Sequence, residues 1–125
     1  MPIVDLDHVQ LAMPSGGENE ARAFYGELLG LPEVAKPANL ARRGGVWFQT
    51  GDRQLHLGIE DDFRPARKAH PALLVRDLEK FRQHLVAHGQ APQDDEPLLG
   101  CRRFYLNDPF GNRLEFIERE TPPEA

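Results

Sequence analysis

The sequence predicts an α+β fold that is made of two repeated halves with mostly antiparallel strands. Two observations lead to this prediction. Stretches in which apolar residues alternate with polar ones are interleaved with two amphipathic helical stretches, and the order of elements in residues 3–60 recurs in residues 68–118. At 125 residues the chain has the length of one compact domain. We therefore expect a single domain over residues 1–125 that contains two modules.

The first half begins with a predicted strand at residues 6–13, where apolar and polar side chains alternate. Residues 17–30 follow as a predicted helix with acidic residues in its first turn and a glycine at its end. The apolar face of this helix carries Ala21, Phe24, Tyr25, Leu28 and Leu29. A Pro-rich stretch to Pro37 then leads to strands at 45–50 and 54–59, which a Gly-Asp turn joins into an antiparallel meander.

The second half repeats this order. Residues 69–75 predict a strand, and residues 76–89 predict a helix with Asp77 as its N-cap and a glycine at its end. The side chains expected to face inward from this helix are Leu78, Phe81 and Leu85. Strands at 101–107 and 113–118, joined by the turn "DPFGN", close the half as a hairpin.

Composition narrows the classes of partner. Fifteen Lys and Arg against twenty Asp and Glu give a net charge of -5, with no sustained basic run, which argues against nucleic acid and anionic membranes as partners. A small-molecule ligand fits this charge better. The start has no basic n-region and no run of eighteen apolar residues is present, so we expect a cytoplasmic protein. Cys101 is the only cysteine, which excludes an intrachain disulfide and favours a packed small residue over a reactive thiolate. We expect the tail at 121–125 to be loose.

Laying one half on the other shows which positions are equivalent. "HVQLAMP" aligns with "HPALLVR", which places His8 on His70. "WFQTGDRQLHL" aligns with "FYLNDPFGNRLEF" across a longer turn, which places His56 on Glu115. On each strand these side chains point away from the neighbouring leucines and phenylalanines, because successive residues alternate between the two faces of a sheet. Imidazoles and a carboxylate are ligands of divalent transition metals, so the repeat predicts a shared metal site.

The sequence resembles the vicinal oxygen chelate superfamily, which includes glyoxalase I, fosfomycin-resistance thiol transferases, methylmalonyl-CoA epimerase, extradiol dioxygenases and bleomycin-binding proteins. The resemblance covers nearly the whole chain and rests on "LDHVQLAM", "FYGELLGLPE", "QLHLG", "KAHPALLVRDLEKFRQHL" and "FYLNDPFGNRLEFIE". It implies two βαβββ modules whose curved, mostly antiparallel sheets surround a cleft with a divalent transition metal, namely Zn, Ni, Co, Mn or Fe. The implied ligands are His8, His56, His70 and Glu115, with Glu115 also acting as a catalytic proton carrier.

The resemblance leaves the ligand set and the reaction open. Glyoxalase I usually has Glu at the position of His56, so a three-ligand site with His56 as a neighbour is the alternative. Its usual glutathione-binding Arg and Asn are replaced here by Ala12 and Glu60. Lyase, isomerase, thiol transferase and dioxygenase chemistry therefore stay open. The competing interpretation is a metal-free drug- or metabolite-binding protein of the bleomycin-resistance type.

Two further expectations concern aromatic residues and assembly. Four aromatic residues on repeat-related strands either wall an apolar pocket or pack in the core, namely Trp47, Phe48, Phe104 and Tyr105. Small two-module members of the superfamily commonly pair modules between subunits. The resemblance therefore implies a homodimer in which a site takes His8 and His56 from one chain and His70 and Glu115 from the other.

Overall fold

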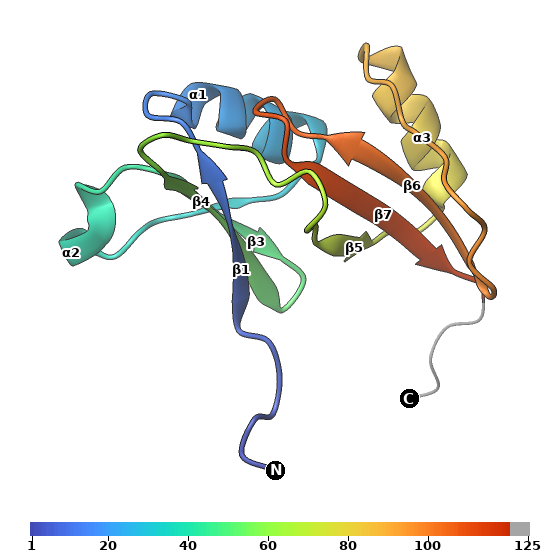
Figure 1. Ribbon diagram of the computed structural model, residues 1–125, viewed down its shortest axis with the longest axis horizontal. Coiled ribbons are helices and arrows are strands. Elements are labelled where there is room, and N and C mark those ends of the chain that lie inside the picture. The colour runs from blue at the N-terminus through green and yellow to red at the C-terminus, as the bar shows by residue number, and fades with distance from the viewer. Residues whose placement is uncertain (121–125) are drawn as a thin grey trace. The chain divides into compact units, whose positions relative to one another are not determined.

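The structure is a computed structural model that describes residues 1–120 (Figure 1). It divides into two compact units, Met1–Ala66 and a second that begins at Arg67. The predicted loose tail at 121–125 lies outside the described residues. None of the helices described here has both the length and the apolar character needed to cross a membrane.

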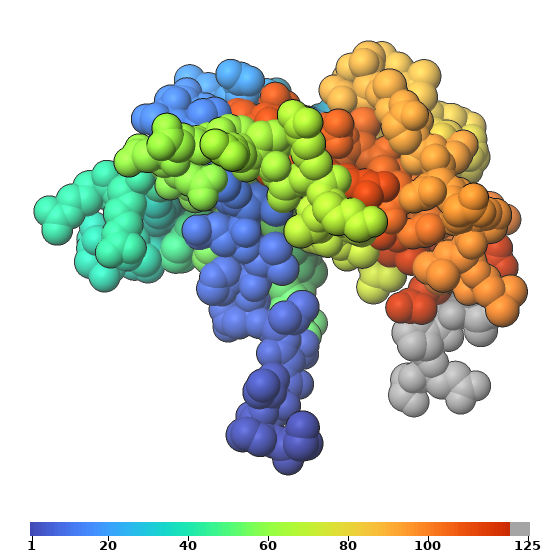
Figure 2. All heavy atoms as spheres, viewed as in Figure 1, coloured from blue at the N-terminus to red at the C-terminus, as the bar shows by residue number. Residues whose placement is uncertain are grey.

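The first unit is a four-stranded sheet with one long helical segment. Its strands lie in the order β1-β4-β3-β2, with β1 parallel to β4 and the other pairs antiparallel. The elements are β1 (His8–Met13), α1 (Glu18–Ala21), a π-helix (Arg22–Leu28), β2 (Glu33–Val34), α2 (Ala38–Ala41), β3 (Val46–Thr50) and β4 (Arg53–Ile59). Figure 2 shows the N-terminal segment before β1, in dark blue, projecting from its unit.

The helix predicted at 17–30 is present, but most of it has π geometry. Leu29 N–H donates to the carbonyl oxygen of Phe24, five residues earlier, instead of to the residue four earlier. The predicted apolar face is still the buried one, because Ala21, Phe24 and Tyr25 are almost completely covered. These residues complete the core of the unit together with Met13, Val46, Phe48, Leu55 and Leu57.

The second unit has a three-stranded sheet in the order β5-β7-β6, again with its first strand parallel to its last. Its elements are β5 (Ala72–Leu74), α3 (Leu78–Ala87), β6 (Cys101–Asn107) and β7 (Arg113–Arg119). A single bridge between Gln93 and Tyr105 occupies the place that β2 has in the first unit. The predicted α+β fold of two related modules, built mainly from antiparallel pairs, is thus confirmed, although the sequence analysis missed the shortest pairings.

Side-chain hydrogen bonds set the start of α3 and of β7. The predicted N-cap is confirmed, since Asp77 accepts from the N–H of Lys80. In the turn before β7, the carboxylate of Asp108 accepts from the N–H groups of Phe110 and Asn112 and from the Asn112 side chain. This buried turn fixes the register of β7, and therefore the face on which each β7 side chain lies. The core below consists of Leu78, Leu85, Phe104, Leu106, Leu114 and Phe116.

Candidate metal centre

In the first unit, the structure brings His8 and His56 together. His56 lies on β4 directly opposite Gln10 of β1, two residues beyond His8. The two imidazole rings stack with centroids 4.4 Å apart. Trp47, directly opposite His56 on β3, stacks on the same imidazole at 3.9 Å with the planes 1° apart. His56 is therefore held between one ring from each neighbouring strand and is only 4% exposed.

Hydrogen bonds fix the orientation of both imidazoles. His56 Nε2 lies 2.9 Å from the amide oxygen of Gln54, and His8 Nδ1 lies 2.9 Å from a carboxylate oxygen of Asp7. Because both partners are acceptors, each imidazole donates one N–H to its partner, which leaves the other ring nitrogen to face a metal. Burial and the adjacent His8 lower the pKa of His56. Neutral imidazoles with one nitrogen held by an acceptor are the form in which histidine binds metal.

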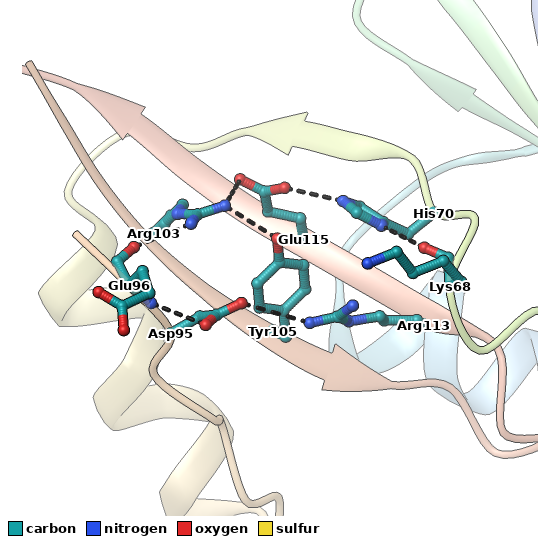
Figure 3. A network of polar contacts seen from close by, with 8 residues as sticks. All are labelled: Lys68, His70, Asp95, Glu96, Arg103, Tyr105, Arg113 and Glu115. Atoms are coloured by element: carbon teal, nitrogen blue, oxygen red, sulfur yellow. Dashed lines mark hydrogen bonds and ion pairs between the residues drawn. The ribbon is translucent and has the colours of Figure 1, made fainter. Parts of the chain in front are cut away.

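In the second unit, the structure brings His70 and Glu115 together (Figure 3). Nδ1 of His70 donates to the carbonyl oxygen of Lys68 at 2.9 Å, and Nε2 lies 2.9 Å from Oε1 of Glu115. A bare nitrogen and a carboxylate oxygen repel at this distance unless a proton or a cation lies between them. Two ligands with metal bonds of about 2.0–2.2 Å at right angles lie about 3 Å apart. The pair therefore has a spacing that suits either a shared proton or a shared metal ion.

Arg103 holds the other oxygen of Glu115, a role that the sequence analysis did not predict. Its guanidinium lies 3.5 Å from Glu115 Oε2, donates to the Tyr105 hydroxyl at 2.9 Å and donates to the carbonyl oxygen of Glu96 at 2.8 Å (Figure 3). Arg113 covers the ring of Tyr105 at 3.8 Å. Glu115 is only 5% exposed. One of its carboxylate oxygens faces Arg103, and the other faces His70. The signal was present in the alternation of β6, which puts Arg103 on the face of Tyr105.

The registers correct one detail of the repeat alignment. The sequence paired Trp47 with Phe104, whereas the structure pairs Trp47 with Tyr105, since each lies directly opposite a predicted ligand, His56 or Glu115. The second turn is one residue longer than the first, whereas the alignment made it two residues longer. The four aromatic residues therefore divide between the two interpretations: Phe48 and Phe104 are core residues, and Trp47 and Tyr105 lie beside the predicted ligands.

The donor set of each unit fits half of a transition-metal site. Protein sites for these metals use three or four ligands, and each unit supplies two. Across residues 1–120, no group of three or more His, Cys, Asp or Glu side chains is gathered closely enough to hold a metal ion. Neither pair alone is therefore a complete transition-metal site.

Comparisons with known proteins give a family and a fold. Residues 6–116 match the Glyoxalase/Bleomycin resistance protein/Dioxygenase superfamily. A solved glyoxalase family protein from Bacillus anthracis is 49% identical, with a TM-score of 0.92 over 94% of this chain and 96% of that one. Lactoylglutathione lyase from Agrobacterium tumefaciens (21% identity, TM-score 0.73, 94% and 96% of the chains) and the fosfomycin resistance protein FosX from Listeria monocytogenes (17%, 0.70, 98% and 96%) have the same fold. No curated protein matches the sequence.

Proposed function

Because the chain belongs to the Glyoxalase/Bleomycin resistance protein/Dioxygenase superfamily, we propose that it is a divalent-metal-dependent enzyme whose small substrate chelates the metal through adjacent oxygens. One observation carries the proposal. Each unit has two side chains of types that bind metals, at equivalent places. One lies on the last strand of the sheet, as His56 or Glu115. The other, His8 or His70, lies two residues before the residue that pairs with it across the sheet. A core or surface role for these residues would not require the same positions to be filled twice.

The proposed ligands are His8, His56, His70 and Glu115, all within one domain of two modules. Three imidazoles and one carboxylate suit Mn, Fe, Co, Ni or Zn and, around an octahedral ion, leave two positions for substrate. When bound, such an ion polarises the adjacent oxygens of the substrate and stabilises the negative charge that develops on them. This chemistry is common to lyase, isomerase, thiol transferase and dioxygenase reactions.

Glu115 is the proposed proton carrier. Arg103 holds Oε2, so the carboxylate stays fixed while Oε1 faces His70. A carboxylate held in this way can accept a proton from carbon or oxygen of a substrate and return it without a change of rotamer. Burial of Glu115 keeps competing water away from that oxygen.

We further propose that the protein is a homodimer in which each metal site takes its two pairs from different subunits. The support is chemical and topological. Each unit supplies an incomplete ligand set, and only a short segment, residues 60–71, which includes His70 itself, joins β4 to β5. In a symmetric dimer, an exchange of units completes two equivalent sites.

Elemental analysis of protein purified without chelator tests the metal proposal. About one transition metal per chain is expected, and His70→Ala or Glu115→Ala should lose it, because either change removes one of the proposed ligands. His84→Ala, which removes a histidine from α3, is the matched control and should keep the metal. Metal-free protein that gains no thermal stability from any of Mn, Fe, Co, Ni or Zn would contradict the proposal.

A further inference from the structure

A hollow in the first unit lies next to the predicted histidine ligands. It has a volume of about 230 Å³, and its walls include Gln10 of β1, Trp47 of β3, Gly58 of β4 and the side chains of Lys36 and Arg43. Successive residues of a strand alternate in direction, so Gly58 is on the same face of the sheet as the residue two before it, His56. Trp47 forms a wall of the hollow and also stacks on that imidazole. The hollow is therefore adjacent to the proposed metal-binding face.

The walls of this hollow carry positive charge in an acidic protein. Residues 34–51 contain one lysine and two arginines and no acidic residue, although the net charge of the chain is -5. Among residues 1–120, neither Lys36 nor Arg43 forms an ion pair. Of the nearby carboxylates, Glu33 pairs with an arginine of the π-helix, and Glu18 accepts a backbone N–H. The two cations are thus available to a ligand anion.

Neutral donors face the same hollow. The Gln10 amide lies against Gly58 so closely that a Cβ at Gly58 would meet its Nε2 at 2.6 Å. Within the described part of the chain, that amide has no hydrogen-bond partner. The ammonium of Lys36 donates to the carbonyl oxygen of Gly44 and lies 6.0 Å from the centre of the Trp47 ring. A cation fixed at the rim, an amide donor and an aromatic wall together make a site for a small oxyanion.

We propose that this hollow binds an oxyanion group of the substrate, a carboxylate or a phosphonate, carried a few atoms from the oxygens that chelate the metal. The inference rests on the proposed function and narrows its substrate class to anionic chelators. Lys36 is the main determinant, because an ammonium already held by a backbone carbonyl loses little freedom when an anion binds. Arg43 adds attraction from the exposed rim, and Gln10 supplies a directional donor.

Binding of two matched chelators to metal-loaded protein tests the inference. 3,4-Dihydroxybenzoate and its methyl ester have the same adjacent oxygens, but only the first carries a free carboxylate. The wild-type protein should bind the acid about tenfold more tightly, the effect of one charge-assisted contact. Lys36→Met and Lys36→Gln should abolish the preference and leave affinity for the ester unchanged, whereas Lys36→Arg should retain it. Arg42→Met, a neighbouring cation that does not line the hollow, is the control and should behave as wild type.

Metal-free protein separates this inference from the metal proposal. Acetate and methylphosphonate, titrated into the wild-type protein, should shift the backbone amide signals of Gly44 and Gly58, and the anion that shifts them at lower concentration identifies the group. Gly58→Ala should weaken the effect without loss of the fold, because its Cβ displaces only the flexible end of Gln10. Absence of these shifts with both anions, or equal shifts in Lys36→Met, would overturn the inference whether or not the protein binds metal. So would an undiminished preference for the acid in that variant.

Discussion

Replacing His56 by Ala separates ligation from packing, because the structure gives this imidazole both roles. Without metal, the substitution removes two ring contacts, with His8 at 4.4 Å and with Trp47 at 3.9 Å. Stacked aromatic contacts contribute about 0.5–1.5 kcal/mol each, so the metal-free protein should lose about 1–3 kcal/mol of unfolding free energy. At this chain length, that corresponds to a fall in Tm of roughly 3–18 °C.

A role in ligation adds a loss that appears only when metal is present. A residue that merely orients a ligand typically contributes about 10–100-fold in metal affinity, and loss of a ligand exceeds that range. Metal that binds only the folded state stabilises it by RT ln(1 + [M]/Kd), so a 100-fold weaker site loses about 2.7 kcal/mol of stabilisation at high metal concentration. The metal-loaded His56→Ala protein should therefore lose at least that much in addition to the packing loss.

The assay is thermal unfolding of wild type and variant, each measured with chelator and with excess metal. His56→Glu is the informative second variant, since it loses the ring contacts but supplies the ligand usual in glyoxalase I. It should therefore resemble His56→Ala with chelator and approach wild type in its response to metal. If the fall in Tm of His56→Ala is the same with chelator and with metal, His56 packs between its neighbours but is not a ligand.

Two other predictions concern assembly and pH. Mixing His8→Ala protein with Glu115→Ala protein should restore about one intact site per heterodimer. The mixture should then bind metal, although neither variant binds it alone. A protein that sediments as a monomer at micromolar concentration would contradict the shared site. At the start of α3, the N–H groups of Leu78 and Asp77 donate to Glu118 and lower the pKa of its carboxyl. Its stabilisation is therefore fully present above the ordinary pKa of 4.5 and is lost as pH falls through the lowered value. Glu118→Gln should lower Tm at pH 7 and should make Tm fall less steeply with pH below pH 4.5. The same fall of Tm with pH in the variant and the wild type would refute this.

The sequence allowed most of the elements to be predicted, together with the equivalence of positions in the two units. Period-two alternation located the long strands, and the repeat aligned His8 with His70 and His56 with Glu115. In the structure His8 lies beside His56, and His70 lies beside Glu115. These predictions succeeded because strand direction fixes the face of each side chain once the register is known. Whether all four residues bind one metal stays a prediction.

Features that depend on local geometry were not predictable in the same way. The π-helix uses the same apolar face as an α-helix, so the pattern of Ala21, Phe24 and Tyr25 does not distinguish the two. Strand β2 and the Gln93 bridge involve one or two residues, too few to show a period. The contact of Arg103 with Glu115 forms because the arginine side chain extends over its face of the sheet to the neighbouring strand. A charged residue on an alternating strand usually indicates a solvent-exposed face, so the pattern gave no reason to expect this contact.

The parallel pairing of first and last strands has a consequence for how the protein is made. Neither β1 nor β5 can enter its sheet until the last strand of its own unit has been synthesised, because each pairs only with that strand. On the ribosome, the first sheet can close once β4 has emerged, whereas the second waits for β7. Until then β1 and β5 lack their hydrogen-bonding neighbours, and such late, non-local closure slows folding. Truncation before Glu115 would therefore remove the proposed ligand and also leave β5 without a partner, because β5 pairs with residues 115–117 of β7.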